Sequence, residues 1–373
     1  MPNGPSDQVP LAQVSRVLVT KLRHHGDVLL ASPVLSVLRR ALPHAEIDAL
    51  VYRETAPMLE RHPALAQLFT IDRGSRPRGT LARLRADVAL LRALRARRHD
   101  LLVHLTEHPR GLVLALVAQP RYAVARLPAR HRWAWNLGFT HYYPWPKGTP
   151  RHTVETNLDA LRRIGIVPRD DDKRLVVVPS ADDEARIDAE LRQRGLAHGS
   201  FAQMHPGSRW LFKAWESERM AEVAHTLAQR GVPVVLTGAP DARERAIVDA
   251  VLAALPPTSR GAVHDLAGRL TLPELAALTA RARLFVGVDS APMHIAAATG
   301  TPVVALFGPS DEREWGPWKV THRVVASPGF PCRPCRNDGC GGGKRSECLA
   351  TLPAGPVLAA IDEVLQGARA AQS

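Results

Sequence analysis

The chain alternates between short apolar runs and longer segments in which apolar residues recur at helical spacing. In the first half, apolar runs at Val14–Leu22, Ile47–Tyr52 and Asp100–Leu105 are separated by helical patterns such as Val28–Leu42 and Leu81–Arg97. Parallel strands form nearly continuous apolar runs because helices cover both faces of their sheet. The alternation therefore predicts an α/β fold with a parallel sheet flanked by helices.

A second series of the same kind follows a stretch of proline and charged residues at Ile166–Lys173, which we take as the linker. Its predicted strands are Leu175–Val178, Phe201–His205, Val232–Thr237, Ala262–Leu266, Leu284–Val288 and Val303–Phe307. We therefore expect two doubly wound domains, at residues 14–168 and 169–352. Residues 1–13 are expected to be disordered, and residues 353–373 to form a C-terminal helix and tail that packs on either domain.

The length of the chain indicates how many domains to expect, and its charge indicates what kind of partner it binds. Its 373 residues suit two domains of similar size. The net charge of +13 belongs entirely to residues 1–170, which hold 26 basic and 13 acidic residues, whereas the remainder holds 23 of each. This asymmetry favours a polyanion or an anionic membrane surface as partner, the alternative being arginines on solvated helix faces. The arginine run Arg76–Arg98 has no interleaved aromatic residues, so no nucleic acid is expected.

The chain contains no apolar run of membrane-spanning length, and its first residues lack the pattern of a signal peptide, so a cytoplasmic location is expected. The four cysteines have the spacing C-x2-C-x4-C-x7-C at Cys332, Cys335, Cys340 and Cys348. Such crowding differs from a disulfide framework spread through a secreted fold. Three interpretations remain open, namely a structural zinc site, reduced packing thiols and an oxidisable loop.

The segment Leu284–Gly308 combines a buried strand, a polar turn, a short helix and a second buried strand. Asp289 and Ser290 stand at the turn, where Ser290 is a predicted N-cap and Pro292 is tolerated in the first helical turn. Free N–H groups at such a helix start face the carboxyl edge of the sheet and can bind an anion. His294 lies one turn further along. The alternative is an ordinary capped βαβ unit.

Three further turns are expected on the same sheet edge. His205-Pro206-Gly207-Ser208 is followed by Lys213, a combination that suits a phosphate-bearing ligand, although a solvated loop lysine would look the same. The other turns are Gly238–Asp241 and Leu270–Leu272. Because the carboxyl ends of parallel strands share one edge, four polar turns there indicate a ligand site more strongly than any one of them.

A tight polar loop with Gly26 and Asp27 follows the first predicted strand. The Asp27 carboxylate can accept a proton from a bound hydroxyl group, or it can simply cap the helix that follows. The chain has neither a G-x-G-x-x-G nor a Walker A pattern, which argues against a dinucleotide enzyme and a P-loop ATPase.

Three stretches together resemble the family nine glycosyltransferases, the bacterial lipopolysaccharide heptosyltransferases. They are KLRHHGDVLLASPVLSVLRR, HPGSRWLFKAW and VGVDSAPMHIAAATGTPVVALFGPSDEREWGPW. The cysteine-rich segment CRPCRNDGCGGGKRSECL is most similar to the heptosyltransferase III subgroup. The resemblance implies a GT-B fold, in which two Rossmann-like domains face each other across a cleft, with the donor on the C-terminal domain and the acceptor on the N-terminal one.

The resemblance also implies roles for individual residues. Asp27 matches the family's catalytic base, and Lys213 matches the lysine that assists the donor phosphates. The donor-binding residues implied are Ser208, Gly238, Asp241, Leu270, Asp289, Ser290, Ala291, Met293 and His294. The acceptor-binding residues implied are Arg23, His24, His25 and Gly26. Ala291 departs from the glycine of many members, which matters little if its backbone N–H is the contact.

The implied reaction is a single inverting displacement that moves heptose from ADP-heptose to a phosphorylated lipid A–core acceptor. No covalent sugar–enzyme intermediate, divalent metal or other cofactor is expected. The basic first half would then meet the anionic inner leaflet, placing the enzyme at the cytoplasmic face of the inner membrane. The alternatives are another nucleotide sugar used for a different surface glycan, and a non-catalytic protein that binds a nucleotide sugar.

Overall fold

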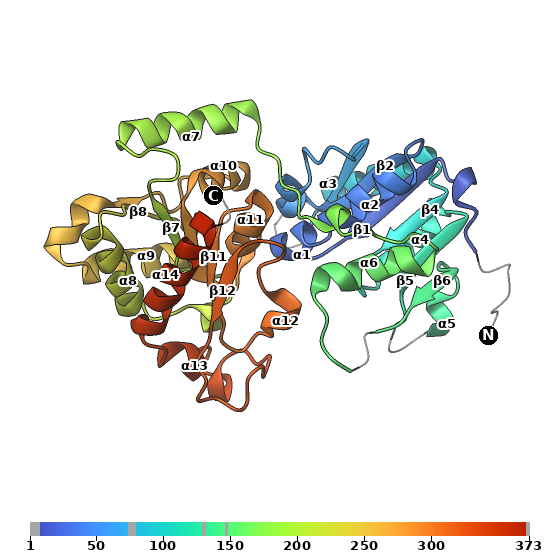
Figure 1. The fold of residues 1–373 in the computed structure, drawn as a ribbon. Coiled ribbons are helices and arrows are strands. Elements are labelled where there is room, and N and C mark those ends of the chain that lie inside the picture. Colours follow the sequence, from blue (N-terminus) through green and yellow to red (C-terminus); the bar gives the residue numbers. More distant parts are fainter. Residues whose placement is uncertain (1–7, 74–79, 129–131, 146–147, 371–373) are drawn as a thin grey trace. The chain divides into compact units, whose positions relative to one another are not determined.

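The computed structural model describes residues 8–73, 80–128, 132–145 and 148–370. Its contacts divide the chain into two compact units, unit 1 at Met1–Val178 and unit 2 at Pro179–Ser373. Each unit holds a six-stranded sheet whose paired strands are all parallel (Figure 1). The predicted pair of doubly wound α/β sheets is therefore confirmed.

Unit 1 has the strand order β3-β2-β1-β4-β5-β6. The strands are β1 (Arg16–Lys21), β2 (Glu46–Tyr52), β3 (Gln67–Ile71), β4 (Leu101–His104), β5 (Tyr122–Arg126) and β6 (His141–Tyr143). The helices are α1 (His25–Leu29), α2 (Ser32–Ala41), α3 (Thr80–Arg97), α4 (Arg110–Ala118), α5 (Arg132–Trp135) and α6 (Thr153–Arg163). The order 3-2-1-4-5-6 is that of Rossmann-like sheets.

Unit 2 repeats this arrangement with the order β12-β11-β10-β7-β8-β9. The strands are β7 (Ala202–His205), β8 (Val234–Leu236), β9 (Val263–Asp265), β10 (Leu284–Val288), β11 (Val303–Leu306) and β12 (His322–Val325). The helices are α7 (Ala181–Gln193), α8 (Ser217–Gln229), α9 (Ala242–Ala254), α10 (Leu272–Arg281), α11 (Ala291–Thr299), α12 (Glu312–Trp315), α13 (Glu347–Ala350) and α14 (Ala354–Ala370). Its first strand, β7, pairs with its fourth, β10, as β1 pairs with β4 in unit 1.

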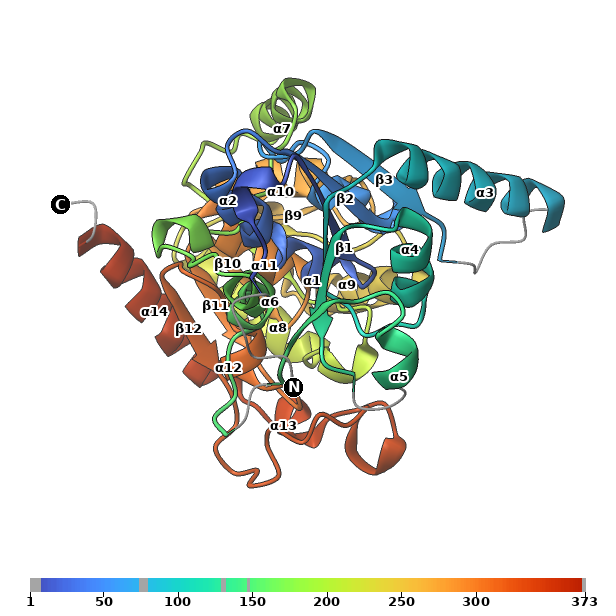
Figure 2. The same ribbon diagram turned by 90° about the vertical axis from the view of Figure 1, so that its right-hand side faces the viewer.

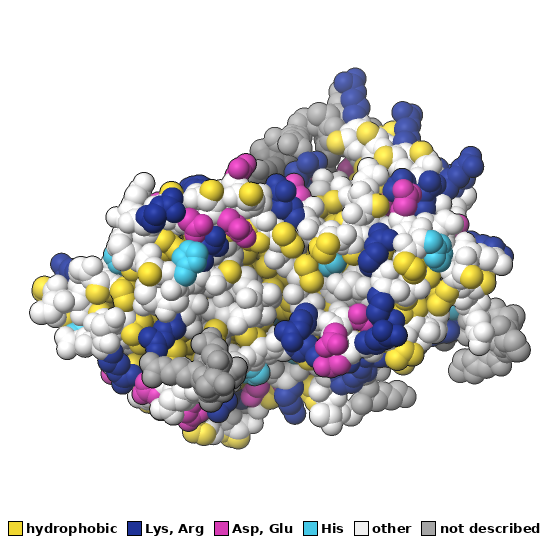
Figure 3. Space-filling model, turned by 45° about the horizontal axis from the view of Figure 1, so that its top comes forward, with side chains coloured by type: hydrophobic (Ala, Val, Ile, Leu, Met, Phe, Trp, Pro, Cys, Tyr) yellow, Lys and Arg dark blue, Asp and Glu magenta, His cyan; other side chains and the backbone are white. Residues whose placement is uncertain are grey.

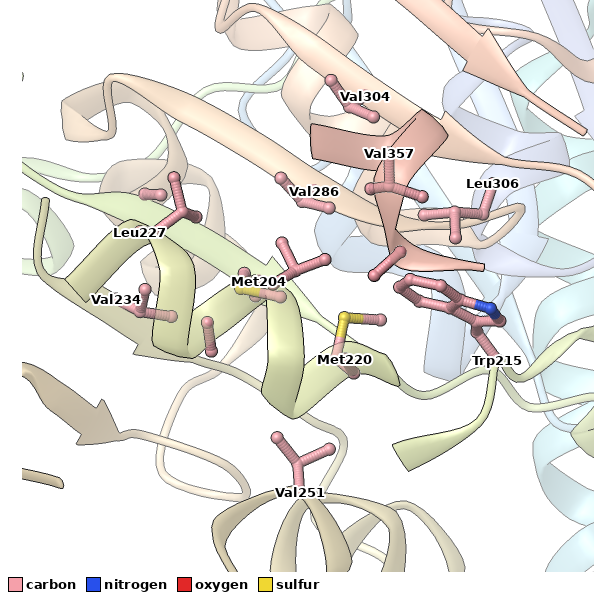
Figure 4. Close-up of a cluster of buried hydrophobic side chains, with 14 of the residues drawn as sticks. Met204, Trp215, Met220, Leu227, Val234, Val251, Val286, Val304, Leu306 and Val357 are labelled. Carbon is pink, nitrogen blue, oxygen red and sulfur yellow. The ribbon is translucent and has the colours of Figure 1, made fainter. Parts of the chain in front are cut away.

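One large hydrophobic cluster of unit 2 joins the central strands to α8 and α14 (Figure 4). Met204 and Val286 meet Trp215 and Val357 there, and the Trp215 Nε1–H donates to the Leu352 carbonyl oxygen at 3.0 Å. Burying side chains of this size stabilises the fold by about 1.5–3 kcal/mol each. The C-terminal helix, whose position the sequence leaves open, therefore belongs to unit 2.

The predicted linker and the domain boundary differ from the structure. Asp172 forms an ion pair with Arg40 at 2.5 Å, and the Val176 N–H donates to the Ser32 hydroxyl at 2.9 Å. These bonds attach the predicted linker and the residues after it, as far as Val176, to unit 1, and the units divide after Val178 rather than after residue 168. The predicted strand Leu175–Val178 is wrong, because its residues form no strand and pair in neither sheet.

Several smaller expectations from the sequence also differ from the structure. The helical pattern Val28–Leu42 splits into α1 and α2, with Pro33 in the first turn of α2. Strands β3, β5, β6 and β12 were not predicted from the sequence, and each lies at or next to the edge of its sheet. Residues 1–7 and 371–373 lie outside the described part of the chain, but Val9 and Val14 are buried, so the expected disorder does not extend to residue 13. Within the described ranges, no helix combines the length and hydropathy needed to cross a membrane.

Candidate active site

The two sheets share one topological feature, a point between their first and fourth strands where the strand order reverses. Ligands of open α/β sheets bind outside the carboxyl ends of the strands at this switch point. In unit 1 the loops after β1 and β4 meet there, because Thr20 is in register with His104. In unit 2 the loops after β7 and β10 meet, because His205 is in register with Gly287. Most of the predicted site residues follow β1, β7 or β10, whereas Gly238 and Asp241 follow β8 and Leu270 follows β9.

Lys213 and Asp289 form the central ion pair of the unit 2 switch point. The Lys213 ammonium donates to the Asp289 Oδ2 at 2.5 Å, although the two residues are 76 positions apart in the chain. The Asp289 side chain is 7% exposed, whereas that of Lys213 is 20% exposed. A charge-assisted hydrogen bond of this length orients the ammonium firmly while leaving part of it open to a ligand.

The start of α11 lies beside this ion pair, but Ser290 does not cap it with its side chain as predicted. The Ser290 hydroxyl donates to the Val288 carbonyl oxygen at 3.1 Å, and Ser290 makes no side-chain cap bond in the described structure. One reason is that Pro292, in the first turn, has no N–H to offer a cap. The N–H groups of Ala291 and Met293 are therefore not engaged by Ser290, as an anion site requires.

The side chains of Met293 and His294 are both buried, at 0% and 3% exposure. Met293 packs in the cluster that covers β10 and β11 together with Phe285 and Phe307. A contact between Met293 and a ligand would therefore have to use its backbone N–H.

A buried network that the sequence analysis missed supports the turn after β7. The Glu244 Oε2 lies 3.3 Å from the His205 Nε2 and accepts the Ala239 N–H at 2.7 Å. The His205 Nδ1 lies 3.0 Å from the Thr237 hydroxyl. Burial pushes the pKa of Glu244 upward, but the bonds with His205 and Ala239 outweigh it and hold that pKa below its ordinary value. The network fixes the two turns that follow β7 and β8.

The chain passes very close to this network at Gly207. A Cβ on Gly207 would stand 2.8 Å from the Glu244 Oε2, so only glycine fits the turn as it is. Ser208 is 3% exposed, and its hydroxyl accepts the Trp210 N–H at 3.3 Å. Glu244 carried little sequence signal, because an acid in the first turn of a helix is common.

Three other predicted donor-binding residues have structural roles. Gly238 lies against α9, where a Cβ would be 3.3 Å from Val248. Asp241 caps α9 by accepting the N–H groups of Arg243 and Glu244 at 3.0 and 3.2 Å. Leu270 packs against a hydrophobic cluster of unit 2. Their contacts with a donor remain predictions.

Asp27 occupies the switch point of unit 1, in the first turn of α1. The N-cap of this helix is His24, so the alternative in which Asp27 merely caps the helix is wrong. Its carboxylate is 12% exposed and lies 3.5 Å from the Arg23 Nε. This position leaves the carboxylate available to a bound hydroxyl group.

The loop before Asp27 is fixed to neighbouring elements. The Arg73 guanidinium bonds to the His24 Nδ1 and to the Arg23 carbonyl oxygen, both at 3.0 Å. The His25 Nε2 lies 2.8 Å from the Glu54 carbonyl oxygen. The predicted acceptor-binding histidines are thus engaged in holding the loop, whereas the Arg23 side chain is 54% exposed.

Lys21, the last residue of β1, was not predicted as a site residue. Its ammonium donates to the Asn157 Oδ1 at 3.0 Å and to the Leu105 carbonyl oxygen at 3.1 Å. Burial lowers the pKa of Lys21 to about 8; the Asp27 carboxylate opposes this shift, and Arg126 adds to it. Lys21 therefore belongs to the same group of charges as Asp27. The signal available in the sequence was a lysine that ends an otherwise apolar strand.

Arg126, at the end of β5, brings a further cation to this edge. It donates to the Glu107 Oε1 at 3.1 Å and lies over the rings of Trp145 and Tyr143, at 4.4 and 5.5 Å. Burial raises the pKa of Tyr143 to about 12, so its hydroxyl stays protonated. Arg126 was not predicted as a site residue because strand β5 was not predicted.

The cysteine-rich loop supports the turn after β11. Arg333 donates to the Gly308 carbonyl oxygen at 2.6 Å, and the Arg336 N–H to that of Pro309 at 2.8 Å. All four cysteines are free, and among the described residues no group of three or more His, Cys, Asp or Glu is arranged to hold a metal ion. The zinc interpretation is therefore not supported. Burial raises the pKa of Cys348, as expected for a packing thiol.

Comparisons with known proteins show the family of the chain. The family model described as glycosyltransferase family 9 (heptosyltransferase) matches residues 88–345. The chain is 34% identical to lipopolysaccharide heptosyltransferase 3 of Escherichia coli K12, over 92% of this chain and 96% of that protein. A second Escherichia coli heptosyltransferase 3 is 33% identical, over 92% and 97%. The two similarities agree with the predicted resemblance to the heptosyltransferase III subgroup.

A solved structure shares the fold. The glycosyltransferase family 9 protein of Veillonella parvula superposes with a TM-score of 0.81 at 24% identity, covering 97% of this chain and 99% of that one. The likeness in fold thus extends over both units. The chain belongs to glycosyltransferase family 9, the heptosyltransferases.

Proposed function

We propose that this protein is an inverting glycosyltransferase that moves heptose from ADP-heptose onto the inner core of lipopolysaccharide. The observation that carries the proposal is the Lys213–Asp289 ion pair beside the start of α11, at the switch point of unit 2. It combines a cation with helix N–H groups, which suits the diphosphate of a nucleotide sugar. The proposal also rests on the printed name of the Escherichia coli relative, lipopolysaccharide heptosyltransferase 3.

Unit 2 is the proposed donor domain. The Lys213 ammonium and the N–H groups of Ala291 and Met293 stabilise the negative charge that develops on the departing ADP. Asp289 holds the ammonium in place and contacts the donor sugar or the phosphate turn. Since the charge on the leaving group is greater in the transition state than in the bound donor, these contacts accelerate the reaction rather than only tightening donor binding.

Unit 1 is the proposed acceptor domain. Asp27 removes the proton of an acceptor heptose hydroxyl while that oxygen attacks the anomeric carbon of the donor. The bond from the anomeric carbon to the ADP oxygen breaks in the same step, so the configuration inverts and no sugar–enzyme intermediate forms. Lys21 places a positive charge near the Asp27 carboxylate. Arg23 and Arg126 are the proposed contacts for acceptor phosphates.

The proposed partner of unit 1 is a phosphorylated lipid A–core acceptor at the cytoplasmic face of the inner membrane. Lys and Arg exceed Asp and Glu by 13 in the first 170 residues and balance them in the remainder. Basic side chains are prominent over unit 1 on the face seen in Figure 3. Such an excess supports attraction to phosphates and to an anionic leaflet.

A transfer assay tests this proposal. Purified protein is incubated with ADP-L-glycero-D-manno-heptose and a truncated, water-soluble lipopolysaccharide core, and the product is weighed by mass spectrometry. We expect a gain of one heptose. Replacing the base in Asp27→Asn should lower kcat by about 10²–10⁴-fold, while the donor Kd, measured by calorimetry, stays unchanged.

Each other result has a definite meaning. An Asp27→Asn variant with full turnover would remove Asp27 from its role as base. Transfer from another nucleotide sugar but not from ADP-heptose would replace the donor and keep the enzyme class. A folded protein that binds ADP-heptose yet transfers it to no acceptor core would support a non-catalytic binding protein instead.

A further inference from the structure

Helix α4 has an unusual outer face. Its sequence RGLVLALVA has one charged residue, at its start, and is otherwise apolar on every side. Leu114 and Ala115 are buried against the sheet, but Val113 is 53% and Leu116 43% exposed. A helix that is apolar all round is normally buried, so the outer face of α4 lacks the polar residues expected next to water.

The segment around α5 extends this apolar surface. Trp133 is 73% exposed and Leu137 is 66% exposed. The chain at Gly138 lies directly on α4, because a Cβ there would be 3.0 Å from the side chains of Ala115 and Leu112. Figure 2 shows α4 and α5 as neighbours on one side of unit 1. We call Val113, Leu116, Trp133 and Leu137 the apolar patch.

The sequence around the apolar patch has no negative charge. Residues 108–154, which include α4, β5, α5 and β6, contain seven Lys or Arg residues and not one Asp or Glu. Helix α3 adds the exposed Arg92 and Arg95, and Arg95 reaches the Val117 carbonyl oxygen of α4 at 3.4 Å. An exposed apolar area bordered by cations is a mark of a binding surface.

We propose that the apolar patch and its basic border dock the enzyme on an anionic lipid bilayer. Trp, Leu and Val side chains enter the boundary between headgroups and acyl chains, and the arginines bind lipid phosphates. Trp133 suits this boundary because its ring has an apolar body and a polar N–H.

Charge favours a bilayer over the other occupants. A second copy that met the same patch about a two-fold axis would bring two basic borders together. A nucleic acid would satisfy the arginines but would leave Val113, Leu116 and Leu137 without an apolar partner. An anionic bilayer satisfies both kinds of side chain at once.

The position of the apolar patch also fits the reaction, and this step rests on the proposed function. Helix α4 follows β4 and α5 follows β5, so both begin on the sheet edge that carries Asp27. A bilayer in contact with α4 and α5 therefore lies next to the proposed acceptor site. A lipid-anchored acceptor would reach that edge without leaving the membrane.

Vesicle flotation tests the docking. The full-length protein is mixed at physiological salt with vesicles of about one part phosphatidylglycerol to two parts phosphatidylcholine, or of phosphatidylcholine alone. We expect binding to the anionic vesicles and about tenfold weaker binding for Leu116→Ser/Leu137→Ser and for Trp133→Ala. Arg92→Glu should weaken binding at low salt more than at high salt. Val167→Ser is the matched control, because Val167 is 75% exposed in unit 1 outside the apolar patch.

Transfer to the water-soluble core is measured on the same proteins, so the two proposals fail separately. Normal transfer by the patch variants together with weakened flotation would support docking through the patch. Flotation of the patch variants equal to that of the Val167→Ser control would overturn it, as would a wild-type protein that transfers heptose but ignores anionic vesicles. A patch-dependent dimer in sedimentation experiments, without vesicle binding, would assign the patch to a second copy. Failure of the wild-type protein to transfer heptose to the water-soluble core would instead count against the proposed function.

Discussion

The two units share one sheet order but use their switch points differently. In unit 1 a lysine at this point is buried and bonded to an amide and a carbonyl oxygen, next to the more accessible Asp27. In unit 2 a lysine is paired with a buried carboxylate and remains partly exposed. In the proposed reaction, the topology therefore sets where each ligand binds, while the side chains decide which part of the reaction each unit serves.

The helices at the switch points share a second property. Strands β1, β4, β7 and β10 are followed by α1, α4, α8 and α11, and in the described structure none of these four helices has a side-chain cap bond at its start. By contrast, the N-cap side chains Ser180, Asp241 and Thr271 bind the first turns of α7, α9 and α10. Capping stabilises a helix but occupies its N–H groups, so uncapped starts suit ligand binding.

The largest expected effect is on kcat, and it distinguishes Lys213 of unit 2 from Lys21 of unit 1. Lys213→Met keeps the length of the side chain but removes the charge proposed to stabilise the departing ADP. We expect kcat to fall by about 10²–10³-fold, as for the loss of one donor that stabilises transition-state charge. Steady-state kinetics with ADP-heptose measures it.

Lys21→Met provides the comparison for this variant. It should disturb stability and acceptor KM through Asn157 and Asp27 more than it weakens donor binding. If Lys21→Met and Lys213→Met weakened donor binding equally, the result would contradict the proposal that unit 2 binds the donor and unit 1 binds the acceptor.

Mild acid should affect unit 1 more than unit 2. Burial lowers the pKa of His104 to about 3 and that of His62 to about 4, and both lie in unit 1. The unfolded chain protonates these histidines near pH 6.5 whereas the folded chain does not, so their stabilisation is full above pH 6.5 and declines as the pH falls. For each histidine, the free energy of unfolding should fall by about 2 kcal/mol between pH 6.5 and pH 5.

Hydrogen exchange at pH 7 and pH 5, resolved by peptide, measures this loss in each unit. Carboxylates with lowered pKa values, such as Asp48 and Glu244, lose their contribution as the pH falls from about 5 through the ordinary carboxylate range, so they do not interfere above pH 5. His62→Gln should reduce the pH dependence of unit 1. A larger loss of protection in unit 2 would contradict the prediction.

The smallest expected effect concerns the helix starts within unit 2. Thr271→Ala removes the hydroxyl that accepts the Glu274 N–H at 3.4 Å in a capping box, and should lower the free energy of unfolding by about 1 kcal/mol. Ser290→Ala should cost less, because its hydroxyl bonds to Val288 and caps nothing. Urea unfolding compares the two variants. A greater loss for Ser290→Ala would show that the start of α11 depends on this hydroxyl for stability.

The sequence by itself determined the fold class and the locations of the turns that carry the site. Apolar runs and helical spacing are local signals, and β10 was predicted with its observed bounds. The turn residues Asp27, Lys213 and Asp289 were identified because parallel strands bring their carboxyl ends to one edge. Local signals also explain the errors, since Leu175–Val178 is apolar but finds no neighbouring strand.

Only the tertiary structure decided which of these residues act together. Lys213 meets Asp289 across 76 positions and Lys21 meets Asn157 across 136, and no periodicity reports contacts at such separations. The same holds for Glu244 behind His205 and for the end of unit 1 at Val178. The spacing of apolar residues in a sequence indicates which side of a helix or strand is buried. Which side chains contact each other depends on how elements far apart in the sequence pack against one another.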